Sequence, residues 1–147
     1  MPVRRKALDW LEMAEEDFKD CERDFRDDRY PSAVFHAEQS AQKAVKALIV
    51  ALGFEPGKTH KPTIVLKALI AGGLVALEKP LMELLDRVIL YATTLEDQGT
   101  MPRYGWETVD RIVKPSELYD QEKAALLIEN AKAVLDGVRE LMGELDC

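Results

Sequence analysis

The amino-acid sequence predicts an all-α protein, an up-and-down antiparallel bundle of four to five helices in a single domain over residues 1–147. Three observations support this fold class. Apolar residues recur at intervals of three and four along most of the chain, which places them on one side of a helix. No segment shows the strict apolar–polar alternation of a half-buried strand. A hydrophobic share of 47% allows one sizeable core.

The first predicted helix covers residues 3–28 and has one apolar and one acidic side. The apolar stripe consists of Ala7, Trp10, Leu11, Ala14, Phe18, Cys21 and Phe25. Residues 9–28 also carry ten acidic and three basic residues. We interpret the acidic side as a solvated outer face, with selection of a partner as the alternative.

A second helix is predicted to begin near Pro31, because a proline suits the first turn, where its missing N–H is not needed. It is expected to end near Leu52, before Gly53. Its small residues would let neighbouring helices approach closely, so we predict that this helix is the central one. These small residues are Ala33, Ala37, Ser40, Ala44, Ala47 and Ala51.

Prolines and glycines delimit the remaining helices. A third helix is predicted from Pro62 to Ala71, before a pair of glycines. A fourth is predicted from Pro80 to about Glu96. The last is expected to start near Asp120, whose side chain suits an N-cap. It has the most regular spacing of apolar residues in the chain.

The connection over residues 97–119 is longer than the roughly 12–15 residues usual for a structureless loop. We therefore expect it to be functional, locally ordered or mobile. It contains Arg103, Tyr104 and Trp106, in an arrangement that could stack a base and contact a phosphate. The alternative is that Tyr104 and Trp106 only attach the connection to the bundle.

The charge of the chain argues against one class of nucleic-acid-binding protein. A net charge of −7 argues against a protein that coats nucleic acid without specificity, because such binding depends on neutralising phosphates. Residues 29–67, however, carry six basic and two acidic residues. This local basic surface is compatible with a small anionic ligand, a short RNA contact or an acidic partner.

The sequence predicts no metal site, no cofactor and no membrane segment. The two histidines, His36 and His60, lie far apart and have no Cys pair beside them. Cys21 and Cys147 are also distant, so no disulfide is expected. The longest uncharged run, residues 68–77, is too short to span a bilayer. Without a signal-peptide pattern, a cytoplasmic protein is expected.

General acid–base chemistry on RNA is one chemistry that these residue types allow. A histidine can move the 2′-hydroxyl proton, and an arginine can stabilise charge on the phosphate. Arg29 and His36 lie seven residues apart, on about the same face if Arg29 is helical. The alternatives are that His36 is a surface or packing imidazole and that His60 caps the third helix.

Several blocks resemble the HEPN family, the higher eukaryote and prokaryote nucleotide-binding domain. The most specific is the run QSAQKAVKAL at residues 39–48, followed downstream by Thr59 and His60. The other blocks are residues 10–18, 29–35, 103–104 and 119–131, so the resemblance covers essentially the whole chain. It implies a bundle of about five helices that is commonly a homodimer. It also implies a gene neighbour encoding a minimal nucleotidyltransferase, in a toxin–antitoxin-like pair.

Some members of this family are metal-independent ribonucleases with an Arg-x(4–6)-His motif near a later helix. In this chain the spacing occurs only at Arg29 and His36, in the second helix, and Gln42 stands where the family has a glutamate. This departure from the active pattern favours a nucleotide-, RNA- or partner-binding module over an enzyme. The alternatives are a ribonuclease toxin that uses Arg29 and His36, and a purely structural helical homodimer. The expected binding residues are Gln39, Lys43, Lys46, His60, Arg103 and Tyr104.

Overall fold

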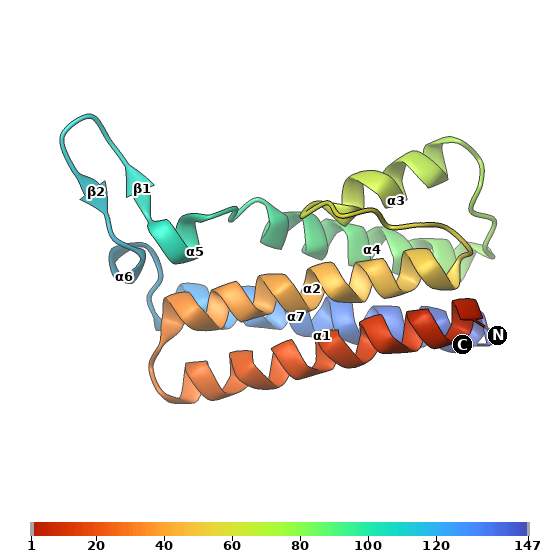
Figure 1. The fold of residues 1–147 in the computed structure, drawn as a ribbon, viewed down its shortest axis with the longest axis horizontal. Helices are drawn as coiled ribbons and strands as arrows, with labels where there is room; N and C mark the ends of the chain where they lie inside the picture. Colours follow the sequence, from red (N-terminus) through yellow and green to blue (C-terminus); the bar gives the residue numbers. More distant parts are fainter. Residues whose placement is uncertain (1, 147) are drawn as a thin grey trace.

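The computed structural model describes residues 2–146, which form a bundle of long helices with a small β-hairpin at one end (Figure 1). Cys147 lies outside the described residues, and Cys21 is a buried free thiol. None of the described helices has the length and apolar character needed to cross a membrane. The elements are α1 (Pro2–Arg26), α2 (Tyr30–Ala51), α3 (Pro62–Ala71), α4 (Lys79–Glu96), α5 (Met101–Tyr104), β1 (Trp106–Glu107), β2 (Ile112–Val113), α6 (Pro115–Leu118) and α7 (Gln121–Glu144).

Helix α2 is the central helix, as predicted from its small residues. It contacts α1 and α7 extensively and also α3, α4, α5 and α6. Ala33, Ala37, Ala44 and Ala47 are fully buried, so the neighbouring backbones come close to that of α2. Helix α7 packs against α1, α2 and α4 and completes the bundle, while α3 lies on α2 and α4.

The junction between α1 and α2 is a tight turn. Asp28 has a φ of 60°, and the Arg29 N–H donates a hydrogen bond to the Asp24 carbonyl (2.8 Å). A left-handed residue of this kind ends a helix, and aspartate tolerates that conformation better than most residues. Helix α1 consequently ends at Arg26, two residues before its predicted end.

The other helix limits agree closely with the prediction. Helix α3 has the predicted bounds, and α4 starts one residue early, at Lys79. The Asp120 side chain accepts a hydrogen bond from the Lys123 N–H (2.8 Å), which confirms it as the N-cap of α7. The expected capping of α3 by His60 is wrong, because its N-cap residue is Lys61 and no side chain makes the capping hydrogen bond.

The connection over residues 97–119 is locally ordered. It contains α5, α6 and an antiparallel hairpin in which Trp106 pairs with Val113. The sequence does not reveal these strands, because two strands of two residues are too short to show alternation. Gly105 has a φ of 75°, and a Cβ there would lie 2.1 Å from the Val113 carbonyl oxygen, so this turn requires glycine. The hairpin projects from the bundle (Figure 1).

Helices α4 and α7 are in close contact at Gly137. A Cβ at this position would lie 2.5 Å from Val88 Cγ2 and 3.5 Å from Leu84 Cδ1. The buried Gly137 therefore allows an approach that a larger residue would prevent.

We expect Gly137→Ala to lower the free energy of unfolding by about 1–2 kcal/mol, because overpacking against Val88 outweighs the gain in helix propensity. The matched control is Gly143→Ala on the same helix, where a Cβ meets nothing within 4 Å. Urea denaturation of both variants measures the difference. A Gly137→Ala protein as stable as Gly143→Ala would contradict this account of the α4–α7 contact.

Candidate functional site

The structure distributes the predicted binding residues over separate places. Lys43 and Lys46 face α1, as described below. His60 is exposed in the connection before α3, and Gln39 is half-buried on α2. Arg103 and Tyr104 lie on α5, which packs against α2. The predicted set therefore does not form one continuous polar surface.

Lys43 and Lys46 attach α1 to α2. Lys43 Nζ lies 2.6 Å from Asp17 Oδ2, and Lys46 Nζ lies 5.1 Å from the centroid of the Trp10 ring. Burial, and then the charge of Lys43, lowers the pKa of Lys46. Both ammonium groups thus have partners on α1, which leaves Arg103 and Tyr104 as the stronger candidates for ligand contacts.

Arg103 is held between two aromatic rings at the surface. Its guanidinium carbon lies 5.0 Å from the centroid of Phe35 on α2 and 5.4 Å from that of Tyr104. Tyr104 is 69% exposed and Trp106 is 56% exposed. The interpretation that these two aromatics attach the connection to the bundle is therefore wrong. Tyr119 has that role, because its side chain is buried in the hydrophobic core of the bundle. Its hydroxyl also donates a hydrogen bond to Gln98 Oε1 (2.9 Å), which joins the two ends of the connection.

Glu38 is a buried carboxylate near Arg103. It is 5% exposed, its Oε1 accepts a hydrogen bond from Gln42 Nε2 (3.2 Å), and its Oε2 has no partner among residues 2–146. Burial raises the pKa of Glu38 to about 7, although the positive charge of Arg103 acts to lower it and the charge of Glu96 adds to the rise. An ionised carboxylate without full hydrogen bonding is costly in a protein interior.

Glu96 and Tyr119 are two further buried polar side chains that interact with the charge of Glu38. Glu96 accepts hydrogen bonds from the Thr63 N–H (3.1 Å) and hydroxyl (2.7 Å), which fixes the start of α3 to the end of α4. Burial raises the pKa of Glu96 despite these bonds. Burial, and then the charge of Glu38, also raises the pKa of Tyr119 to about 12. Glu38 therefore has Tyr119 among its neighbours.

His36 is paired with Asp24 of α1. Its Nδ1 donates to Asp24 Oδ2 (2.8 Å) and lies 3.1 Å from the Ser32 carbonyl oxygen. Since both partners are acceptors, Nδ1 carries a proton, and Nε2 remains available to a ligand. The Ser32 hydroxyl donates to the same Asp24 oxygen (2.6 Å). Burial acts to raise the pKa of Asp24, but the bonds from Ser32 and His36 hold it below its usual value.

The predicted partner of His36 was Arg29, and the structure places this arginine differently. Arg29 is the exposed N-cap residue of α2, with backbone angles outside the helical region. Within the described chain, its side chain makes no hydrogen bond or ion pair with His36. The His36 ring instead lies 5.3 Å from that of Phe35, on which Arg103 stacks. We call these three side chains the Arg103–Phe35–His36 row.

The sequence interpretation missed Phe35, Glu38 and Asp24. Glu38 follows Val34 by four residues on the buried side of α2, so an acid on an otherwise apolar stripe was the available signal. Nothing in the local sequence connects Asp24 to His36, because they belong to different helices. In the part of the chain that the structure describes, no group of three or more His, Cys, Asp and Glu side chains is placed to hold a metal ion.

Comparisons with known proteins agree with this architecture. The family model of the HEPN domain matches residues 7–141. A protein of Methanocaldococcus jannaschii named "Putative toxin MJ1304" is 27% identical over 135 residues, which cover 92% of this chain and 87% of that protein.

Two solved structures are similar in fold and confirm the predicted helical bundle. The first is ST0689, described as an archaeal HEPN homologue, with a TM-score of 0.66 and 24% identity over 93% of this chain and 98% of that one. The second is TT1696 from Thermus thermophilus, with a TM-score of 0.71 and 24% identity over 92% of this chain and 98% of that one.

The raised pKa of Glu38 makes stability depend on pH. The folded state keeps a proton that the unfolded chain releases near pH 4.5, so the free energy of unfolding falls as pH rises from 4.5 to about 7. The contribution of Glu38 to this fall is about 3 kcal/mol. Glu38→Gln should remove that contribution in urea titrations between pH 4 and 8, whereas the exposed control Glu140→Gln should keep the wild-type slope. An unchanged slope in Glu38→Gln would show that this carboxyl is ionised in the fold.

Proposed function

The chain belongs to the HEPN domain family, and on this premise we propose that it is a cytoplasmic, toxin-like module that binds RNA or a nucleotide at the Arg103–Phe35–His36 row. We further propose that it forms a homodimer and pairs with a protein carrying a nucleotidyltransferase domain. The similarity to the M. jannaschii protein named a putative toxin supports the toxin-like role. The family resemblance of the sequence supports the partner.

The observation that carries the proposal is the position of Arg103. Its guanidinium stacks on Phe35 and Tyr104, and it makes no ion pair in the described chain, so its N–H groups are available to a phosphate. The exposed rings of Tyr104 and Trp106 lie on the same short segment. Stacking of a base on such a ring contributes about 1–3 kcal/mol, whatever the base. A cation beside exposed aromatics suits a short single-stranded contact.

The hairpin supports a protein partner. Trp106, Val109 and Ile112 are exposed apolar residues on an element that projects from the bundle. Exposed apolar groups gathered in this way are typical of an interaction surface.

A second candidate function is metal-independent RNA cleavage, which the His36–Asp24 pair favours. Asp24 fixes the orientation and tautomer of the ring, and Nε2 is left free to transfer a proton. This candidate replaces Arg29 with Asp24 as the partner of His36, while Arg103 is the cation at the other end of the row.

Binding of a short fluorescent single-stranded RNA, measured by anisotropy, tests the first candidate. We expect Arg103→Ala to weaken binding about tenfold, because a charge-assisted contact to phosphate is lost. Tyr104→Ala should weaken it about fivefold or more through lost stacking. The matched control is Arg87→Ala, an exposed arginine of α4. Equal RNA affinities of the Arg103→Ala and Arg87→Ala proteins would show that the Arg103–Phe35–His36 row is not part of the binding site.

Incubation of the protein with RNA in EDTA separates the two candidates. If the protein is a binding module, the RNA stays intact. If it is a ribonuclease, cleavage should persist in EDTA and disappear in His36→Asn, whose amide can still donate to Asp24 and so preserve the fold. His60→Asn serves as the control histidine. Cleavage that survives His36→Asn would exclude His36 as the acid–base group.

Pairing is tested by co-expression with a protein that carries a minimal nucleotidyltransferase domain. Co-purification in a defined ratio is expected, and light scattering of the free chain should give the mass of a dimer. Trp106→Ala should reduce the recovery of the complex, because it removes an exposed ring of the hairpin. Full recovery with Trp106→Ala would place the partner elsewhere on the bundle.

A further inference from the structure

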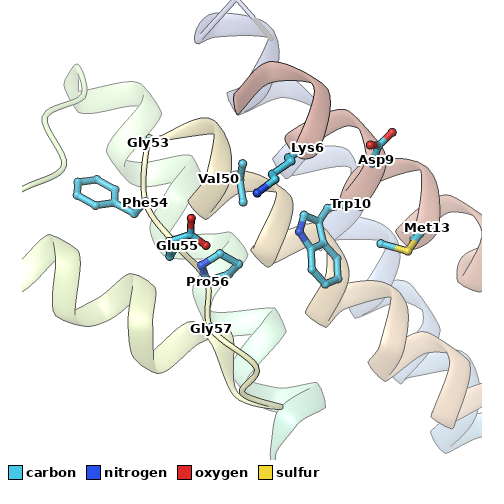
Figure 2. Close-up of a pocket in the computed structure, with 10 residues that line it drawn as sticks. All are labelled: Lys6, Asp9, Trp10, Met13, Val50, Gly53, Phe54, Glu55, Pro56 and Gly57. Atoms are coloured by element: carbon cyan, nitrogen blue, oxygen red, sulfur yellow. The ribbon is translucent and has the colours of Figure 1, made fainter. Parts of the chain in front are cut away.

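A groove lies between α1 and the segment that follows α2, away from the Arg103–Phe35–His36 row (Figure 2). Its volume is about 460 Å³, within the range of small-molecule sites. Three separate segments line it, which gives it a concave shape. The lining residues are Lys6, Asp9, Trp10 and Met13 of α1, Val50 of α2, and residues 53–57.

The apolar part of the groove is ordered before any ligand binds. Val50 and Pro56 are buried, and Figure 2 shows the Trp10 indole and the Pro56 ring on different sides of the groove. Lys46 Nζ, 5.1 Å from the Trp10 ring centroid, holds the indole against α2. Met13 is 37% exposed and adds a flexible apolar side chain beside the indole.

Two charges of opposite sign face the groove without partners. Lys6 extends from α1 toward the loop, and the Glu55 carboxylate is directed back from the loop (Figure 2). Among the described residues neither of them forms an ion pair, whereas Asp9 is paired with Arg5 (3.2 Å). The groove thus offers one free cation, one free anion and an apolar wall.

We propose that this groove binds a free amino acid with an apolar side chain. The α-carboxylate pairs with Lys6, the α-ammonium pairs with Glu55, and the side chain packs against Trp10 and Met13. A zwitterion complements both charges at once, which an anionic nucleotide cannot do. The acidic surface of α1 around Asp9 also disfavours a phosphate. This site is independent of the proposed RNA or nucleotide function.

The two tryptophans of the chain allow a direct test. In a Trp106→Phe protein, Trp10 is the remaining tryptophan and reports on the groove. Leucine is a suitable probe because it does not absorb where tryptophan does. We expect leucine to change the Trp10 fluorescence in a saturable manner. Leucinamide, which lacks the carboxylate, and N-acetylleucine, which lacks the ammonium, should each bind about fivefold more weakly.

Charge-removing variants then match each ligand group to its residue. Glu55→Gln should weaken leucine about fivefold and leave N-acetylleucine unchanged, because that ligand has no ammonium to lose. Lys6→Gln should weaken leucine similarly and leave leucinamide unchanged. Both positions are exposed, so folding is preserved. Lys79→Gln and Glu107→Gln, exposed at other sites, are the matched controls and should bind leucine as the parent does.

Several results would overturn the proposal. One is the absence of any fluorescence change or heat with leucine at tens of millimolar. Another is equal binding of leucine, leucinamide and N-acetylleucine, which would show that the α-carboxylate and α-ammonium do not contribute to binding. Tighter binding of guanosine than of leucine would assign the groove to a nucleobase instead. RNA binding that is weakened as much by Lys6→Gln or Glu55→Gln as by Arg103→Ala would assign the groove to the nucleic-acid site instead.

Discussion

The burial of α2 on nearly all sides is the constraint on which this structure depends. The polar groups of such a helix that are buried from water must be satisfied through a neighbour. Ser40 does so by donating to the Ala14 carbonyl of α1 (2.7 Å), and Lys43 by pairing with Asp17. These bonds also determine how α1 lies along α2. Glu38 is the exception, with one carboxylate oxygen unpaired in the described chain.

The candidate site lies where α2 meets α5 and α1, and its two side chains on α2, Phe35 and His36, are only partly buried. At the α5 side of α2, the exposed Arg103 stacks on Phe35, and its positive charge acts to lower the pKa of the buried Glu38. The nearby His36 is held by a carboxylate from α1. The central helix therefore supplies one ring to α5, through Phe35, and one to α1, through His36.

The helices were predictable because each signal is local: spacing of apolar residues, prolines at helix starts and glycines after helix ends. The Asp120 N-cap and the limits of α3 follow from such signals. The pairing of side chains in the candidate site could not be predicted in this way, because it depends on contacts between helices. A helical projection groups Lys43 and Lys46 with Gln39, but it does not show that α1 takes up both ammonium groups. For the same reason, Asp24 was missed and Arg29 was assigned to His36.

The hairpin of residues 106–113 leaves the bundle at an obligatory glycine, Gly105, and returns through Lys114 to α6. Beyond its own two strands it is held by the ion pair of Arg111 with Glu117 of α6 (2.9 Å). Its residues contribute almost nothing to the core, so selection for a stable fold places little restraint on them. The segment between Gly105 and α6 can consequently change in length and sequence from one relative to another while the bundle stays intact. The binding specificity of the hairpin can therefore diverge faster than the fold of the bundle. Replacing the hairpin with another loop would change the binding partner and leave the fold of the bundle intact.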